Sequence, residues 1–381
     1  MITRRDIARW WTQLLPFKGG CRVGLLILQC LILLNSCSEE QLDMTRPVEV
    51  TSYVSWFEED VAVTRAWAPP TGYSKYDIGD KSIGICFTQN GEEPMKGQFF
   101  ESSGKWRTNI ENIEAEDYYL YGYAPHSAGI SCEISSTATP EDWSKFDKGA
   151  VMKLKNVPTI TGNDMCVVIG AKEGPNKETD NGLRRGDFKY HASASQTGNF
   201  VFLLFDHIYA ALNINIKVHG DYDELRTIKL KNISLRSISS GSPTKEKTDI
   251  TVTLAANDGT SNPISSVSFD PNGADSEEYE VFKSSEGTTL TTGYQSFVSY
   301  FMPTGVTKFI MTSVYDIYDK KGNKVREDCK ATNGLVLSEL FDRFEEAEKI
   351  GTRYNINLTI QPTYLYMLSE PDLNNPTMTI N

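Results

Sequence analysis

The sequence predicts an all-β protein built of two sandwich domains, and three observations favour this fold class. The chain has 381 residues, which is more than a single hydrophobic core usually supports. Its composition, 39% hydrophobic and 23% charged, is that of an ordinary globular protein. From about Val48 onward, short runs of alternating apolar and polar residues recur between Gly, Pro, Asn and Asp, which is the pattern of antiparallel strands.

Residues 1–36 have the pattern of a signal peptide. Basic residues precede a short apolar stretch between Arg22 and Asn35. As a helix this stretch would be about 18 Å long, whereas the hydrocarbon core of a membrane is about 30 Å thick. The pattern therefore predicts a cleaved signal and not a permanent membrane span.

The residues that follow predict a lipid anchor. Leu34-Asn35-Ser36-Cys37 resembles the bacterial lipoprotein cleavage box, in which the cysteine sulfur receives diacylglycerol. Each buried methylene contributes about 0.8 kcal/mol, so acyl chains on Cys37 would hold the protein on a membrane. Ser38-Glu39-Glu40 resembles the export tag of lipoproteins on the outer face of the Bacteroidetes outer membrane. The alternatives are a buried thiol at Cys37 and a solvated linker at 38–40.

The strand pattern is clearest at 211–218, where one set of side chains is expected to face the core: Leu212, Ile214, Ile216 and Val218. The segment 225–235 changes phase, which predicts a bulge near Lys231-Asn232. Residues 319–324 predict a hairpin turn. One short helix is predicted at 338–351, with Ser338 as its N-cap.

A tyrosine-rich stretch, 118–123, is predicted to be a strand with Tyr119, Tyr121 and Tyr123 on one face and Tyr118 and Leu120 on the other. Cross-strand aromatic packing is the more common use of such a stripe, and stacking on sugars is the alternative.

The small, polar stretch 191–199 is the predicted domain boundary. Residues 37–65 then form a linker and a first strand, 66–195 the N-terminal sandwich, and 196–381 the C-terminal sandwich. The formal charge is −12, and the basic residues of 1–36 leave the rest of the chain more acidic still. Such a surface repels phosphate backbones, so we expect no nucleic-acid partner.

No catalytic motif is present: the sequence lacks GxGxxG, GxxxxGK[ST], HExxH and GxSxG. The four histidines have no metal-ligand spacing and are expected to be surface or interface imidazoles: His126, His191, His207 and His219. Four cysteines follow Cys37 without CxxC spacing, and no disulfide pairing can be assigned: Cys86, Cys132, Cys166 and Cys329. We expect no enzymatic activity, no metal and no cofactor.

Four stretches in this order resemble the Bacteroidetes fimbrillin family, the subunits of type V pili. They are 61–67 (VAVTRAW), 117–125 (DYYLYGYAP), 205–212 (FDHIYAAL) and 351–358 (GTRYNINL). The resemblance implies two tandem transthyretin-like (Ig-like) β-sandwich domains. It also implies a lipoprotein precursor that is exported to the surface of the outer membrane and assembled with other subunits into a fimbrium.

The resemblance further implies assembly by strand exchange. A trypsin-like protease cuts after an arginine, the first strand leaves, and an extended segment of a neighbour takes its place. Within residues 37–65, we expect the first strand to be the removable one and the cut to fall at Arg65-Ala66. Arg46 is the rival position, but Pro47 follows it and obstructs such cleavage.

The tail 363–381 is the candidate donor. The residues expected to pair and fill pockets are Tyr364, Tyr366, Leu368, Met378 and Ile380. The same tail suits the last strand of its own domain equally well, and the two alternatives stay open.

The sequence thus predicts a fimbrial subunit, adhesive or structural, with a host molecule or a glycan as an open ligand. The alternative is a monomeric surface glycan-binding lipoprotein of a polysaccharide-uptake system. A secreted hydrolase with an unrecognised carboxylate pair is a third reading.

Overall fold

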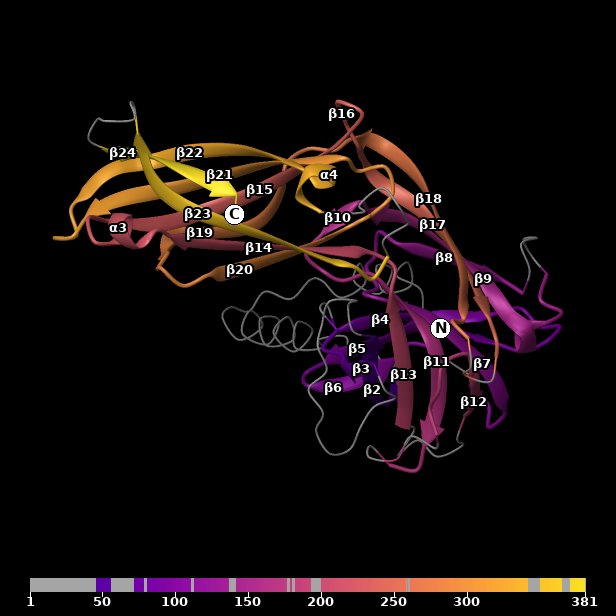
Figure 1. Ribbon diagram of the computed structural model, residues 1–381. Helices are drawn as coiled ribbons and strands as arrows, with labels where there is room; N and C mark the ends of the chain where they lie inside the picture. The colour runs from indigo at the N-terminus through magenta and orange to yellow at the C-terminus, as the bar shows by residue number, and fades with distance from the viewer. Residues whose placement is uncertain are drawn as a thin grey trace, which may run out of the picture. The chain divides into compact units, whose positions relative to one another are not determined.

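The computed structural model describes residues 46–55, 72–78, 81–110, 113–136, 142–176, 179, 182–192, 200–257, 259, 261–341, 350–364 and 371–380. Thr45–Asn381 is one compact unit. Its described residues are mostly strands in four sheets (Figure 1), so the all-β prediction is confirmed.

A ten-stranded sheet contains most of the strands before residue 208. Its order is β1 (Arg46–Pro47), β6 (Lys105–Thr108), β5 (Met95–Ser102), β4 (Ser82–Thr88), β7 (Asp117–Ala124), β11 (Cys166–Gly174), β13 (Phe200–His207), β2 (Glu49–Ser55) and β3 (Tyr73–Lys75), with β12 (Lys189–His191) on β7.

The first described segment bridges the two ends of this sheet order. β1 pairs with β6 at one end, β2 pairs with β13 near the other, and only Val48 separates β1 from β2. The Val48 amide donates to the Trp106 carbonyl at 3.1 Å. The sheet is therefore curled and closed by Arg46–Ser55, which we call the closing segment.

A four-stranded sheet packs on the ten-stranded sheet. Its order is β18 (Ile264–Asp275), β17 (Lys245–Ala255), β9 (Gly149–Pro158) and β8 (Ser131–Ser135). Residues of both sheets share one buried cluster, the inter-sheet core, which includes Tyr121, Val167, Phe202, Met152 and Val252. The opposite face of the ten-stranded sheet encloses a second cluster, the inner core, which includes Phe87, Phe99, Val168 and Phe205.

The tyrosine-rich strand β7 divides its side chains between these two cores. Tyr121 and Tyr123 belong to the inter-sheet core and Tyr119 packs against it, whereas Tyr118 and Leu120 belong to the inner core. The predicted faces are confirmed. Tyr121 packs its ring against Phe188 at 4.5 Å, so this stripe packs within the protein.

Two further sheets form the second sandwich. One has the order β10 (Ile160–Thr161), β20 (Gln295–Phe301), β14 (Ala210–Val218), β23 (Arg353–Tyr364) and β24 (Pro371–Ile380). The other has the order β16 (Ser242–Pro243), β15 (Arg226–Ser239), β21 (Lys308–Asp319) and β22 (Lys324–Val336), with β19 (Tyr279–Thr289) on β15. Their facing sides share a third buried cluster, the C-terminal core.

Alternation in β14 predicted its buried face correctly. Leu212, Ile214 and Ile216 are fully buried in the C-terminal core. The register of β15 shifts between Leu230 and Asn232 against both neighbouring strands, which confirms the predicted bulge. The predicted hairpin is also present, because the Asp319 amide donates to the Asn323 carbonyl at 2.9 Å between β21 and β22.

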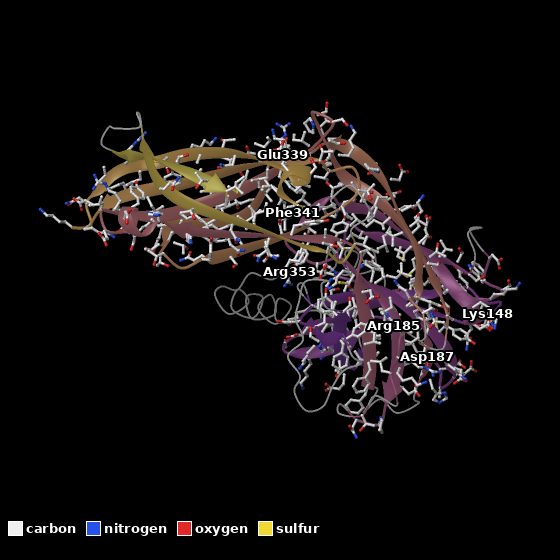
Figure 2. All side chains as sticks on the ribbon, in the orientation of Figure 1. Lys148, Arg185, Asp187, Glu339, Phe341 and Arg353 are labelled. Atoms are coloured by element: carbon white, nitrogen blue, oxygen red, sulfur yellow. The ribbon has the colours of Figure 1, made fainter. Side chains whose placement is uncertain are left out.

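The described helices are short, and they differ from the prediction of one helix capped by Ser338. They are η1 (Phe146–Lys148), a 3-10 helix, and two α-helices, α3 (Gly220–Asp223) and α4 (Leu337–Leu340). α4 begins one residue before Ser338, so this serine lies inside the helix. Residues 342–349, the middle of the predicted helix, lie outside the described residues. Phe341, labelled in Figure 2, packs its ring against Tyr354 at 4.8 Å.

Segments from both sides of the predicted domain boundary contribute to each sandwich. The β17–β18 hairpin completes the four-stranded sheet beside β9, and β10 pairs with β20. Among the buried clusters, the change from the inter-sheet core to the C-terminal core falls between Tyr209 and Ala210. The stretch 193–199, where the boundary was placed, lies outside the described residues.

Within the described part of the chain, the helices lack the length and apolarity that crossing a membrane requires.

Candidate functional site

The closing segment is an integral part of the ten-stranded sheet. β2 runs parallel to β13 in continuous register, from Glu49 opposite Phe200 to Val54 opposite Phe205. On its other side, Tyr53 to Ser55 pair antiparallel with β3. Parallel neighbours need a long crossover, and here the paired positions Glu49 and Phe200 are 200 − 49 = 151 positions apart in sequence.

Side chains of the closing segment enter both cores. Val48, 7% exposed, belongs to the inner core, and Val50 and Val54 pack against it. Tyr53, 6% exposed, belongs to the inter-sheet core. The strand thus fills space on both faces of the sheet, as the alternation of a strand requires.

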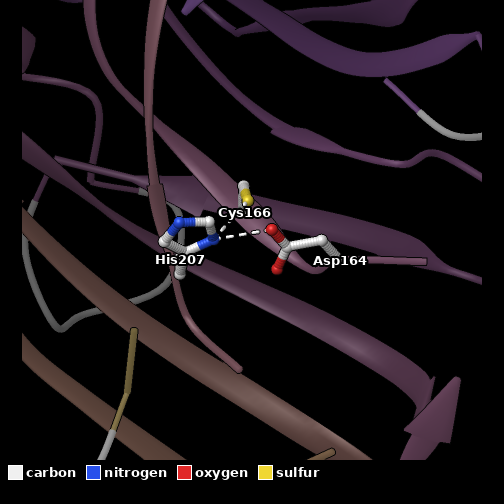
Figure 3. A group of neighbouring side chains, drawn as sticks. All are labelled: Asp164, Cys166 and His207. Atoms are coloured by element: carbon white, nitrogen blue, oxygen red, sulfur yellow. Dashed lines mark hydrogen bonds and ion pairs between the residues drawn. The ribbon is translucent and has the colours of Figure 1, made fainter. Parts of the chain in front are cut away.

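A polar contact holds the last residue of the closing segment. His207, the last residue of β13, donates from Nε2 to the Ser55 carbonyl at 2.8 Å. Nδ1 of the same ring is 2.6 Å from Oδ2 of Asp164 (Figure 3). Beside it, the Tyr73 hydroxyl donates to Asp206 at 3.2 Å. Residues at the end of β13 therefore hold both β2 and β3.

His207 and Asp164 form a buried pair with side chains 2% and 9% exposed. Burial lowers the pKa of His207, but the hydrogen bond and charge of Asp164 and the Ser55 carbonyl raise it to a value above the ordinary 6.5. Both ring nitrogens face acceptors, so the ring can donate to both only when it is protonated. The geometry and the direction of the pKa shift agree.

Asp164, Cys166 and His207 are also the one group of three metal-type donors among the described residues, within 4.8 Å of one another. They lack the arrangement of a catalytic triad. Cys166 Sγ lies 3.6 Å from Nδ1, the nitrogen that Asp164 also uses, while Nε2 is bonded to Ser55. Cys166 is fully buried, and burial raises the pKa of its thiol. The group can fix a strand end, but a substrate has no access to the sulfur.

The predicted lipidation and cleavage residues, Cys37, Arg65 and Ala66, lie outside the described residues. In sequence, Arg65-Ala66 falls between the end of β2 at Ser55 and the start of β3 at Tyr73. The structure thus places the strand that precedes the predicted cut inside the ten-stranded sheet.

The candidate donor tail pairs with its own chain. β24 is the last strand of its sheet and runs antiparallel to β23, with Tyr364 opposite Pro371. Met378 is 6% exposed and Ile380 is 38% exposed. Tyr366 and Leu368 lie outside the described residues.

The sequence did not single out the two residues that hold the strand end. His207 was expected to be a surface or interface imidazole, and that expectation is wrong because the residue is 4% exposed. The sequence signal that could have found His207 is the pair Asp206-His207, which stands between two strongly apolar runs. Ionisable residues in such a place are seldom buried without a partner, so the pair indicates a buried polar contact. Asp164 lies 43 residues earlier, and only the fold brings it to His207.

A cavity of about 580 Å³ opens at another place in the first sandwich. Its lining includes Trp143, Glu93, Glu133, Lys96 and Lys153. An aromatic ring among charged groups is a surface on which a sugar can stack and form hydrogen bonds.

No protein-family model and no curated protein matches the chain. Several solved structures do match the chain. A candidate cell adhesion protein from Bacteroides uniformis is 12% identical, with 90% of this chain and 99% of that chain covered and a TM-score of 0.32. A fimbrial protein from Bacteroides vulgatus is 13% identical, with 88% and 98% covered and a TM-score of 0.33. The fimbrial anchor protein Mfa2 from Porphyromonas gingivalis is 9% identical, with 87% and 97% covered and a TM-score of 0.25.

These neighbours are fimbrial and cell-adhesion proteins of Bacteroidetes. They are of the class that the four sequence stretches resemble. At these identities and TM-scores, the likeness carries no weight for function.

Proposed function

We propose that the chain is a fimbrial subunit, displayed on the cell surface as a lipoprotein precursor, and that it polymerises by strand exchange without catalysing a reaction. The observation that carries the proposal is the position of the closing segment. Arg46–Ser55 bridges both ends of the ten-stranded sheet and lies just before the predicted cut in sequence. Its departure would open the sheet along one continuous edge of β13.

A cut at Arg65-Ala66 by a trypsin-like protease would leave the closing segment held by non-covalent contacts alone. It would also separate the subunit from the lipid on Cys37, because that residue precedes the cut. Contacts with other subunits would then retain the protein at the outer membrane. Export to that surface accords with the signal sequence and the Ser-Glu-Glu tag.

The free energy that holds the cut segment is modest. Its well-buried apolar side chains are Val48 and Tyr53, and burying such a side chain contributes about 1.5–3 kcal/mol. An incoming strand would form the same backbone hydrogen bonds with β13. A donor that fills the inner core better could therefore replace the segment.

The C-terminal tail suits the donor role. β24 is at the edge of its sheet, so it can leave without dividing that sheet. Strand exchange would also cover the bare edge of β13, and exposed edges of this kind promote aggregation.

Limited trypsin digestion of the purified precursor tests the proposal. We expect one new N-terminus at Ala66, followed by oligomers in size-exclusion chromatography. Arg65→Gln should abolish both results, whereas the matched variant Arg46→Gln should leave both unchanged. A chain that is cut at Ala66, loses the closing segment and still stays monomeric would contradict strand exchange.

A second candidate function, glycan binding by a monomer, is favoured by the cavity around Trp143. A glycan array with the wild-type protein and the Trp143→Ala variant separates the two functions. Glycan binding that depends on Trp143, together with a monomer after trypsin treatment, would support the glycan receptor.

A further inference from the structure

Cys86 and Cys132 lie on opposite sheets of the first sandwich and face the same core. Cys86, in β4, is 2% exposed and belongs to the inter-sheet core, while its neighbours Ile85 and Phe87 belong to the inner core. Cys132, in β8, is half-buried and packs against the inter-sheet core. The pleat of each strand thus turns its thiol toward the other sheet.

The two thiols lie at the same cavity of the first sandwich. Both line one cavity of about 270 Å³, together with Tyr123 and His126. The neighbouring Cys86 thiol, together with burial, raises the pKa of the Cys132 thiol. A disulfide needs two side chains that point at each other from Cα atoms about 4.4–6.8 Å apart. Two thiols that face one core from opposite sheets and line the same cavity satisfy the first requirement.

We propose that Cys86 and Cys132 form a disulfide bond in the exported protein, which joins the ten-stranded sheet to the four-stranded sheet across the inter-sheet core. All four described cysteines are thiols in the structure. The proposal rests on the proposed function only for the surface location, where thiols meet an oxidising environment.

The oxidant is a disulfide donor of the thiol-oxidoreductase or glutathione class. The Cys132 thiolate, the more exposed of the two, attacks one donor sulfur and releases the other as a thiol. The Cys86 thiolate then attacks Sγ of Cys132, and the second donor thiol leaves. The two cysteines lose two protons and two electrons, and the donor disulfide gains them.

Such a bond would keep the two sheets together while the ten-stranded sheet is open. When the closing segment leaves, the inner core loses Val48 and the packing of Val50 and Val54. The inter-sheet core loses Tyr53. A covalent link from β4 to β8 would limit the separation of the sheets until a donor strand arrives.

Peptide mapping tests the bond. The purified full-length chain is equilibrated in mixtures of oxidised and reduced glutathione, unfolded in iodoacetamide, digested and analysed by mass spectrometry without reduction. We expect a linked peptide that joins Cys86 to Cys132, with Cys166 and Cys329 alkylated. The oxidised chain should melt roughly 10 °C above the reduced chain.

The variants Cys132→Ser and Cys329→Ser form a matched pair. Cys132→Ser should leave Cys86 alkylated and remove the difference in melting temperature, whereas Cys329→Ser should change neither result. Alkylation of both Cys86 and Cys132 after oxidation, or a link from either to another cysteine, would overturn the proposal. A linked peptide without a rise in melting temperature would overturn the structural effect of the bond. Each of these results is independent of trypsin cleavage and polymerisation, so failure of one proposal leaves the other standing.

Discussion

His207 donates a hydrogen bond from Nε2 to the Ser55 carbonyl at 2.8 Å, and this contact joins the last residue of the closing segment to the last residue of β13. Asp164 accepts from the other ring nitrogen at 2.6 Å. A neutral imidazole has one N–H and can serve only one of the two acceptors. The strand end is therefore held best when His207 is protonated.

Stability should fall as the pH rises through the folded pKa of His207. This pKa is raised above 6.5, so folding favours the protonated ring. The contribution is complete below the ordinary pKa and is lost above the folded one. Urea unfolding at a series of pH values from about 6 to about 9 measures the effect. In this range we expect a lower midpoint at higher pH.

The variant His207→Gln is the control for this pH dependence. Gln has no titratable ring, so the slope of the midpoint against pH should decrease. Burial raises the pKa of Asp206 as well. A carboxyl group whose folded pKa is raised also makes the protein less stable as the pH rises toward that pKa. Asp206 adds a slope of the same sign only up to its own folded pKa. An unchanged slope in His207→Gln would show that the His207 ring does not titrate as described.

The variant Phe205→Ala should destabilise the site of the closing segment. Phe205 is fully buried in the inner core and packs edge-on against Tyr76 at a centroid distance of 5.3 Å. Removing a buried Phe ring typically costs about 3–5 kcal/mol in unfolding free energy. Val298→Ala, at a residue that is 41% exposed, should change the value by less than about 0.5 kcal/mol. Equal effects in the two variants would refute this account of the inner core.

The variant Gly149→Ala should disturb the pairing of β9 with β17. The φ angle of Gly149 is +130°, and a Cβ atom there would lie 2.0 Å from the Leu254 carbonyl oxygen. We expect a loss of about 3 kcal/mol or more in unfolding free energy, because the clash is with backbone. Gly91→Ala is the matched control, since its φ is +85° and nothing lies within 4 Å of the added atom. That variant should cost only about 1 kcal/mol. Thermal or urea denaturation of the two variants measures both losses of unfolding free energy.

Deletion of residues 371–381 should leave the chain folded but unable to polymerise after trypsin treatment. β24 is an edge strand, and Met378 is its described buried apolar residue, so about 2 kcal/mol of stability should be lost. Circular dichroism checks the fold, and size-exclusion chromatography checks the oligomers. The full-length variant Met378→Ala should lose similar stability and still polymerise if backbone pairing carries the exchange. Oligomers formed by the truncated chain would exclude this tail as the donor.

Alternation along the chain was sufficient to predict many strands and the faces they bury. In β14, the polar residues that alternate with the apolar ones pair across the sheet, with Asn213 donating to Asn355 at 2.9 Å and Asn215 to Asn357 at 3.0 Å. The bulge near Lys231-Asn232 was visible because a phase change shifts every later side chain to the other face. These features depend on neighbours in sequence, so the sequence alone carries them.

The short helices were harder to predict. α3 has four residues, Gly220–Asp223, which is too few for helical periodicity to show. For α4, the candidate cap at Ser338 was an incorrect choice because the helix starts at Leu337. In a chain of this kind, helix ends depend on packing against neighbouring strands more than on intrinsic propensity.

The sequence by itself determined that the chain is a β protein and which residues of its clearest strands are buried. It also predicts a signal peptide at residues 1–36. Only the tertiary structure decided that β2 lies beside β13, that Asp164 reaches His207, and that Cys86 faces Cys132. The physical reason is that periodicity tells which face of a strand is apolar, whereas its partner is selected by packing among segments far apart in sequence.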